Sequence, residues 1–231
     1  MNNFVDWKNP YKESDGKWFK GNLHTHTSPS SGCAKVQLDV SVSTYVKKDY
    51  DFLSVSDHMS LNIPDESRLV CIPGIEWNSP SGEHAGLYSL DKEILNEASQ
   101  INDQNIIRSK YFGEKTILVL NHPNWGRTEH YKTDQLRQRT DCDGIEIYNA
   151  VIERLAGCAL STDKWDLLLS EGIQLLGFAS DDSHDKDQIG RGWICVKAKK
   201  RNPESIFNAI KSGNFYCSTG VVLTNIKREK N

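Results

Sequence analysis

The sequence predicts an α/β fold for this chain of 231 residues, and three observations support that prediction. Short apolar runs alternate along the chain with segments of helical periodicity, which is the pattern of strand–helix units. Several runs are apolar throughout, as is typical of strands buried on both faces of a parallel sheet. The length suits one domain with a sizeable core. We therefore expect a single domain over residues 1–231, and allow for a short C-terminal extension beginning near residue 219.

Eight segments have the composition of strands. Aliphatic, aromatic and β-branched residues dominate them, and turn-forming residues bound them. They are residues 18–23, 52–56, 69–77, 85–90, 116–121, 144–149, 174–180 and 193–198. The last residues, from Ser218 onward, are also β-like in composition.

Two segments between these runs carry clear helix signals. Residues 162–172 have three apolar side chains at helical spacing and then a glycine. In residues 201–213, Asn202 is placed as the N-cap, Pro203 as the first helical residue and Gly213 just past the end. The alternation of strands and helices fits both a barrel and an open sheet.

Composition excludes several classes of protein. A net charge of −3 argues against a dedicated duplex nucleic-acid surface. No apolar run approaches the ~20 residues that a bilayer span needs, so we expect no membrane partner. The six cysteines form no CxxC pair, which indicates reduced thiols and a cytoplasmic protein rather than a zinc ribbon.

Histidines gather at the ends of the predicted strands. His24, His58, His122 and His184 each lie at or just after such an end, whereas His84 precedes its strand. In a (β/α) barrel the C-terminal strand ends form the face that carries the active site. We therefore expect these side chains to converge.

Carboxylates accompany the histidines and complete a typical set of metal ligands. His24 and His26 stand two residues apart on an extended segment, so both imidazoles can point to one ion. Glu76 closes one strand, and Asp181 and Asp182 precede the last strand-end histidine. Imidazole and carboxylate groups together bind zinc, manganese or iron. Because a carboxylate can bridge two ions, Glu76 is the best bridging candidate.

Six motifs in this order resemble the polymerase-and-histidinol-phosphatase (PHP) family. They are HTH at 24–26, SDH at 56–58, GIEWNS at 74–79, EHAGLYSL at 83–90, NHPNW at 121–125 and SDDSH at 180–184. The later GRGWICVKA and NFYCSTG resemble the closing segment of that family. The resemblance implies a distorted (β/α)7 TIM-like barrel and metal-dependent phosphoesterase activity with two to three divalent ions, zinc, manganese or iron.

The resemblance also implies roles for individual residues. One metal site would be formed by His24, His26, Glu76 and Asp182, a second by Glu76, His84 and His122, and a third by His58 and His184. Asp57 would orient its neighbours rather than bind an ion. The chain departs from the family where an aspartate, or a histidine one residue later, usually completes the third site, because Ser31 and Gly32 stand there. Ser31, Asp181 or water is left to complete it.

Several further side chains are candidates near the predicted site. Arg127 and Arg191 each follow a metal motif, and a guanidinium suits phosphate oxygens, although either could be an ordinary surface residue. Trp77 and Trp125 adjoin metal motifs and would either stack on substrate or pack in the core. His130 matches no motif and is expected at the surface.

We therefore expect hydrolysis of a phosphomonoester or small phosphodiester by a metal-activated water, with His184, or a water that it holds, protonating the leaving oxygen. The partner would be a small phosphorylated substrate, for example a nucleotide. Two alternatives stay open. An amidohydrolase-type enzyme also opens with HxH but needs one terminal aspartate and often has a metal-bridging lysine. A non-catalytic metal-binding PHP module would keep the fold without the activity.

Overall fold

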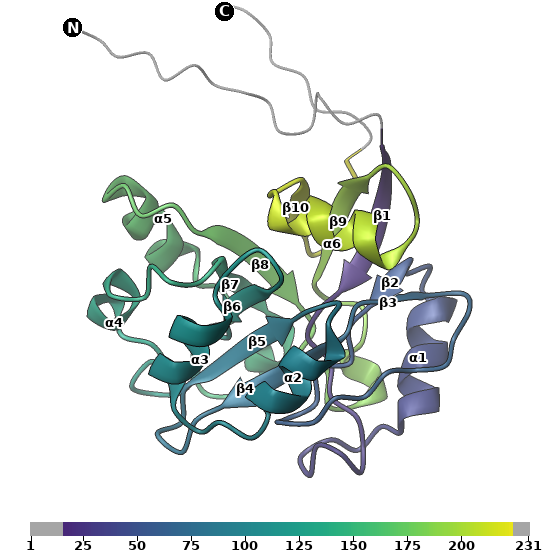
Figure 1. Cartoon of the computed structure of the whole chain (residues 1–231), viewed down its shortest axis with the longest axis horizontal. Coiled ribbons are helices and arrows are strands. Elements are labelled where there is room, and N and C mark those ends of the chain that lie inside the picture. Colours follow the sequence, from purple (N-terminus) through teal and green to yellow (C-terminus); the bar gives the residue numbers. More distant parts are fainter. Residues whose placement is uncertain (1–15, 224–231) are drawn as a thin grey trace, which may run out of the picture.

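The computed structural model describes residues 16–223 and has a mixed α/β fold (Figure 1). The strands are β1 (Lys17–Asn22), β2 (Phe52–Leu53), β3 (Val70–Cys71), β4 (Gly74–Asn78), β5 (His84–Tyr88), β6 (Ile117–Leu120), β7 (Gly144–Asn149), β8 (Leu176–Ser180), β9 (Trp193–Ala198) and β10 (Phe215–Ser218). The α-helices are α1 (Leu38–Lys47), α2 (Lys92–Ala98), α3 (Gln104–Tyr111), α4 (Thr133–Arg137), α5 (Thr162–Ser170) and α6 (Pro203–Lys211). Two short 3₁₀ helices, η1 (Ala150–Arg154) and η2 (Lys186–Gln188), follow β7 and β8.

The first sheet has the strand order β10-β9-β1-β2-β3. Strand β1 pairs in parallel with β2 and antiparallel with β9. Gly21 in β1 is required by close packing, because a Cβ atom at this position would lie 2.2 Å from the ring of Phe52. This contact fixes β1 and β2 closely side by side, and the segments that follow both strands lead into the candidate site.

The second sheet has the order β4-β5-β6-β7-β8. Strands β4, β5 and β6 are mutually antiparallel, whereas β6, β7 and β8 run in parallel. Because β5 runs opposite to its neighbours, its first residue lies at the same end of the sheet as the last residues of β4 and β6. This reversal explains how His84 can precede its strand and still reach the other histidines.

The closed seven-stranded barrel expected from the sequence does not form in the described residues. Two five-stranded sheets are present instead, and single bridges connect them, between His58 and Glu76 and between Thr25 and Ser183. The physical reason is partly local: the expected strand 69–77 is interrupted by Pro73, which cannot donate a ladder hydrogen bond. The run therefore divides into β3 and β4, which belong to different sheets.

The core lies between and around the sheets. One cluster takes Phe52 and Val196 from the first sheet and Val119 and Phe178 from the second, and the apolar face of α6 joins it. A second cluster packs α2, α3 and α5 on the second sheet, and a third packs α1 on the first. With the sheets supported on both sides, the loops at their strand ends are held in place.

Helix ends follow the sequence signals. Asn202 caps α6 by accepting a hydrogen bond from the amide of Ser205, and Pro203 begins the helix. Gly172 and Gly213 both have the positive φ that a glycine after a helix end readily adopts. Residues 219–223 form no strand, and the rest of the β-like tail lies outside the described residues.

All six cysteines are free thiols. Within residues 16–223, no helix has both the length and the apolar character that a membrane span requires.

Candidate metal centre

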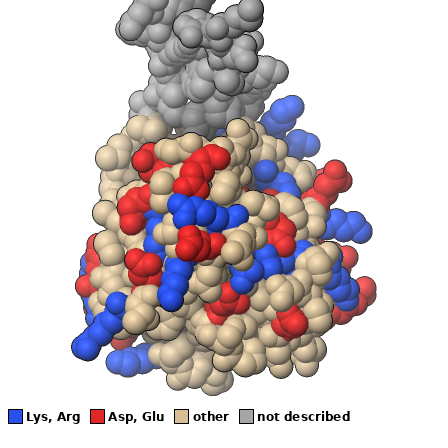
Figure 2. Space-filling view, turned by 90° about the vertical axis from the view of Figure 1, so that its left-hand side faces the viewer, with Lys and Arg blue, Asp and Glu red and all other residues tan. Residues whose placement is uncertain are grey.

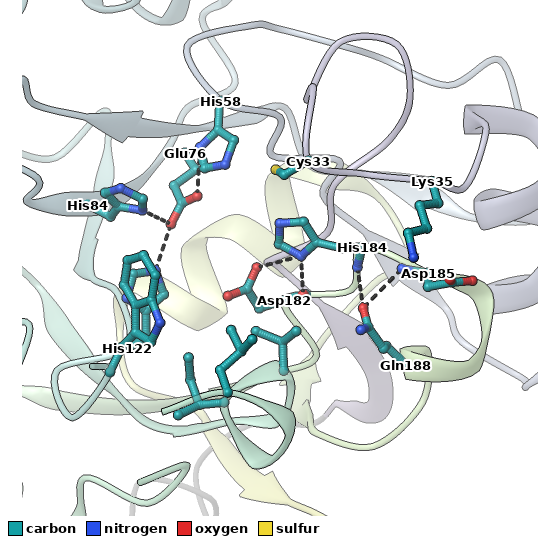
Figure 3. A pocket seen from close by; sticks show the side chains of 14 residues that line it. Cys33, Lys35, His58, Glu76, His84, His122, Asp182, His184, Asp185 and Gln188 are labelled. Carbon is teal, nitrogen blue, oxygen red and sulfur yellow. Dashed lines mark hydrogen bonds and ion pairs between the residues drawn. The ribbon is translucent and has the colours of Figure 1, made fainter. Parts of the chain in front are cut away.

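The structure brings the eight predicted metal-binding residues together at one end of the two sheets. Figure 3 shows those that line the adjoining cavity, which are His58, Glu76, His84, His122, Asp182 and His184. His24 and His26 follow β1, His58 follows β2, Glu76 lies in β4 and His84 begins β5, while His122 follows β6 and Asp182 and His184 follow β8. Their ligand atoms form four overlapping groups, within each of which all atoms lie within 4.8 Å of one another. Residues far apart in sequence therefore meet as the strand-end pattern predicts.

Glu76 stands at the centre of the cluster and is almost fully buried. Its Oε1 atom lies 3.2 Å from a ring nitrogen of His24, 3.2 Å from one of His84 and 3.1 Å from one of His122. Its Oε2 atom lies 3.2 Å from His26 and 3.0 Å from His58. Each carboxylate oxygen thus faces a different set of imidazoles, which is the arrangement that a bridging ligand needs.

The two histidines of the HxH motif turn their lone pairs toward each other. His24 Nδ1 lies 2.8 Å from a carboxylate oxygen of Glu146, which can only accept, so Nδ1 carries the proton. The Ser31 hydroxyl donates to Asp57, so it accepts from His26 Nδ1 at 3.0 Å. In the neutral imidazoles both Nε2 atoms are then acceptors, yet they lie 3.1 Å apart. Two facing acceptors repel unless a cation lies between them.

Asp182 adds a further unpaired acceptor at the same place. Its Oδ1 atom lies 3.2 Å from His24 Nε2 and 3.1 Å from His26 Nε2. This oxygen is buried and accepts no hydrogen bond. Buried polar atoms are rarely left without a partner, so the convergence of Nε2, Nε2 and Oδ1 fits a metal ion better than it fits a protein-only network.

Local charge favours a cation here. Burial would lower the pKa of the His24 imidazole, but the carboxylates of Asp182, Glu76 and Glu146 outweigh burial and raise that pKa well above its usual range. Burial would raise the pKa of the Glu76 carboxyl, but the surrounding imidazoles hold that pKa well below its usual range. The site therefore stabilises positive charge, which a metal ion or a proton can supply.

Two of the clustered residues have unusual backbone conformations. His122 has φ 35° and Asp182 has φ 49°, in the left-handed region that non-glycine residues seldom adopt. Such strain is characteristic of functional sites, where the surrounding structure holds it in place. In both residues the backbone turns sharply just after a strand and aims the side chain into the cluster.

Glu146 is a residue that the sequence interpretation missed. It lies in β7, is buried, and accepts hydrogen bonds from His24 Nδ1 and from the backbone amide of His122 at 2.7 Å. It therefore orients two candidate ligands at once. A signal was available, because GIEIYN places one acidic residue inside a mostly apolar and mostly buried strand.

Asp57 holds the loop after β1, as the sequence interpretation expected of an orienting residue. Its carboxylate accepts from the amide and hydroxyl of Thr27 at 2.6 and 2.7 Å, from Ser31 at 2.7 Å and from Asn62 at 2.7 Å. Asp181 has a comparable role on the other side. It accepts from the backbone amides of residues 190–192 and so points away from the cluster, which leaves Asp182 as the aspartate that faces the imidazoles.

A cavity of about 420 Å³ opens beside the cluster. One side presents the imidazoles and carboxylates, and the other is an apolar wall from η1 and its end, formed by Val151, Ile152 and Leu155. Trp125 and Lys35 also line it. The volume falls in the range typical of small-molecule sites.

The two predicted arginines do not reach this cavity. Arg127 is exposed and does not line it, because Gly126 adopts a positive φ and the loop turns toward solvent. The guanidinium of Arg191 lies 3.3 Å from the Asp187 carbonyl and 4.0 Å from Glu153, and it does not line the cavity either. The cation that does line it is Lys35, which the sequence interpretation did not single out.

Three other expectations are settled by packing. His130 is only partly exposed: its ring packs against His84, His122 and Trp125, and its Nε2 atom accepts from the His84 amide at 3.2 Å. Burial, followed by the neighbouring imidazoles, lowers the pKa of His130 to about 3, so its ring is neutral. Trp77 is fully buried in the core, whereas Trp125 lines the cavity.

The remaining cavity residue of interest is Cys33. The sequence interpretation did not single it out, because it stands outside every motif. Hydrogen bonds with His184 and His58 lower the pKa of its thiol to about 6. The pKa of His184 is raised, because the bond with this thiol and the Asp182 carboxylate together outweigh burial.

No family model matches the sequence, and no curated protein sequence matches it. Solved structures do match. A two-domain protein from Bacteroides vulgatus that contains a predicted PHP-like metal-dependent phosphoesterase is 17% identical, with a TM-score of 0.66 over 93% of this chain and 69% of that one. Endonuclease Q from Pyrococcus furiosus, a lesion-specific endonuclease, is 14% identical, with a TM-score of 0.64 over 87% of this chain and 58% of that one.

These structures correct one expectation, that a protein of this kind has no dedicated duplex nucleic-acid surface. An Endonuclease Q structure that matches this chain with a TM-score of 0.60, 14% identity and coverage of 84% of this chain and 57% of that one holds a 27-mer duplex with an abasic lesion at its active site. Net charge was a poor guide because it averages over the whole surface. Figure 2 shows basic and acidic side chains interspersed on one face, which a single net value does not describe.

The resemblance drawn from six sequence motifs is thus confirmed at the level of the fold. At 14–17% identity the solved structures establish the architecture and leave the reaction to be argued from the site. This chain has the fold shared by the PHP-like metal-dependent phosphoesterase protein of Bacteroides vulgatus and Endonuclease Q.

Proposed function

We propose that this chain hydrolyses a phosphate ester with the help of at least two divalent metal ions. The observation that carries the proposal is the position of Glu76, whose two carboxylate oxygens face separate groups of imidazoles. The facing Nε2 atoms of His24 and His26, together with the unpaired Asp182 oxygen, support it. A carboxylate rather than a lysine at the centre favours a phosphoesterase over an amidohydrolase-type enzyme.

The proposed ligand sets are those that the sequence resemblance implies, and the distances within the cluster are compatible with them. His24, His26, Glu76 and Asp182 would hold one ion, and Glu76, His84 and His122 a second. When bound, such ions supply Lewis acidity toward phosphoryl oxygens and make a nucleophile of water at neutral pH. The residues around them keep the ligands in the correct protonation state, since Glu146 and Ser31 fix the protons of His24 and His26 on Nδ1.

Other cavity residues would act on the substrate itself. The Lys35 ammonium can pair with phosphate oxygens in place of the predicted arginines. His184 is partly exposed at the cavity, so in a protein with two ions it can donate a proton to the leaving oxygen. The apolar wall of η1 and the ring of Trp125 would contact the non-phosphate part of the substrate.

The cavity is large enough for a small phosphorylated molecule such as a nucleotide. A second candidate substrate is a phosphodiester bond in a nucleic-acid strand. The specific observation that favours it is the likeness of the fold to Endonuclease Q, and Trp125 beside the cluster could stack on a base exposed at a lesion.

The test is hydrolysis by the manganese-loaded and zinc-loaded protein of three substrates: an aryl phosphate, a panel of phosphorylated metabolites and a duplex with an abasic site. The variant Glu76→Gln should lose nearly all activity, and Glu114→Gln, which changes an exposed glutamate remote from the cavity, should keep it. No turnover of any phosphate ester by the fully metal-loaded protein would overturn the proposal and favour a non-catalytic metal-binding module.

A further inference from the structure

A third group of potential ligands remains beside the proposed pair of sites. His26, His58 and His184 have ligand atoms within 4.8 Å of one another. His26 is engaged at the first proposed site, so His58 and His184 are left without a carboxylate of their own. A metal site of two imidazoles needs at least one more protein ligand to be held firmly.

Neither residue at the expected position supplies that ligand. Gly32 has no side chain, and the Ser31 hydroxyl is saturated. It donates to Asp57, and it accepts from His26 Nδ1 at 3.0 Å and from the backbone amide of His58 at 3.1 Å. Ser31 therefore orients the imidazole of His26 and has no lone pair left to bind an ion.

Asp181 is also engaged elsewhere. Its Oδ1 atom accepts from the amides of Arg191 at 2.6 Å and Gly192 at 2.8 Å, and its Oδ2 atom accepts from Gly190 at 2.7 Å and from Tyr45 at 2.9 Å. This carboxylate closes the loop after β8 and cannot turn toward His184 without breaking that network.

Cys33 is placed where the missing ligand belongs. Its side chain lines the cavity together with those of His58 and His184. Figure 3 shows its sulfur directed toward the space between these two imidazoles. Cys33 directly follows Ser31 and Gly32 in the same loop. Its thiol therefore stands only one or two residues after the positions where the family usually has an aspartate or a histidine.

The hydrogen bonding of His184 leaves one of its ring nitrogens able to bind a metal. Its Nδ1 atom lies 3.5 Å from Asp182 Oδ1, the oxygen that is assigned to the first proposed ion. The same Nδ1 lies 2.8 Å from the Asp182 carbonyl oxygen, which can only accept, so Nδ1–H donates to it. In the neutral ring the lone pair is then on Nε2, and it is free to bind a metal.

We propose that Cys33, His58 and His184 hold a third divalent ion, with the cysteine bound as a thiolate. The inference rests on the proposed function, because the other ligands of the cluster belong to its two sites. Binding of the ion releases the thiol proton to solvent, so the site exchanges one proton for one metal–sulfur bond. Three protein ligands leave a fourth position open on the cavity side, as in catalytic zinc sites.

A sulfur ligand gives this site a preference among metals that the two imidazole–carboxylate sites lack. Thiolate favours zinc, iron(II) and cobalt(II) over manganese and magnesium. The third ion would therefore be the one most sensitive to oxidation of the protein, because oxidation of the thiolate removes its ligand.

The test uses the full chain, stripped of metal and titrated with cobalt(II). The wild type should bind three equivalents, and the third should bring a near-ultraviolet sulfur-to-cobalt charge-transfer band. The variant Cys33→Ser should lose the band and one equivalent, and Cys33→Asp should keep the equivalent without the band. Cys158→Ser is the matched control, because Cys158 is exposed and lies outside this cavity.

The outcomes separate the two proposals. Two equivalents and no band in the wild type would overturn the role of Cys33 and leave the two-ion function standing. A band that persists in Cys33→Ser would also overturn it, since another thiol would then be the ligand. No bound cobalt at all would overturn both.

Discussion

Glu146 offers a sharp test of whether the cluster is built to bind metal, because this carboxylate touches no proposed ion. Its Oε1 atom accepts from His24 Nδ1 at 2.8 Å and from the Ser180 hydroxyl. Its Oε2 atom accepts from the His122 amide at 2.7 Å and from Asn149 at 2.8 Å. All of these donors are buried, so replacing Glu146 by glutamine keeps the shape and removes only the charge and one acceptor.

Either orientation of the new amide creates a conflict. With its nitrogen at the Oε1 position, the amide faces the Nδ1–H of His24, and the imidazole must move its proton to Nε2, the atom that faces Asp182 and Glu76. With its nitrogen at the Oε2 position, it faces the backbone N–H of His122, which cannot reverse. A buried donor left without an acceptor costs about 1–3 kcal/mol.

The expected result is a loss of metal affinity rather than of fold. Removing the partner that orients a ligating histidine typically weakens metal binding about 10–100-fold, which corresponds to about 1.4–2.8 kcal/mol. Competition with a chromophoric chelator measures the affinity of Glu146→Gln, with Glu114→Gln as the exposed control and circular dichroism to confirm folding. Unchanged affinity in a folded Glu146→Gln protein would refute the assignment of His24 as a ligand.

Four further outcomes are expected. Burial lowers the pKa of His58, but its bonds with the neighbouring thiol and carboxylate outweigh burial and raise that pKa to about 10. Thermal melts of the metal-free protein should therefore show a loss of stability as pH rises from about 6.5 toward 10. Metal affinity should rise over the same pH range, because the proton no longer competes with the metal for the imidazole. Lys35→Ala should raise KM for a phosphate ester about 10-fold or more with a smaller change in kcat, and unchanged KM would remove Lys35 from phosphate recognition. Arg127→Ala should leave both constants near those of the wild type, since its side chain lies outside the cavity, and a large loss would restore the arginine to the site. Gly21→Ala should destabilise the fold by roughly 1–3 kcal/mol in urea unfolding, because its methyl group would meet the Phe52 ring, and a neutral effect would show that β1 and β2 can separate.

The sequence predicted the parts of the molecule whose signals are local. The runs 144–149 and 193–198 match β7 and β9 residue for residue, and the caps around Asn202 and Gly213 stand where the helix signals put them. The histidines converge because each follows or begins a strand, and strand ends at one edge of a sheet are necessarily close. Residue type and position along the chain were sufficient for that inference.

The features that the sequence could not predict depend on the direction in which loops turn and on the way strands pair. A motif does not show which way a loop turns, so Arg127 and Arg191 were expected at a cavity that their side chains do not enter. Glu146 differs from its neighbours in strand β7 by residue type and belongs to no spaced motif, so an interpretation based on motifs and spacing missed it. The division of 69–77 at Pro73 and the reversal of β5 change the sheet order without changing the apolar pattern.

The central claim is that Glu76 bridges two metal ions, and anomalous diffraction from crystals of the manganese-loaded protein tests it most directly. Data collected at the manganese edge should show two peaks about 3.5–4 Å apart. One peak should lie next to Oε1 of Glu76 among His84 and His122, and the other next to Oε2 among His26 and its partners. A single peak, or peaks that do not contact Glu76, would contradict the account.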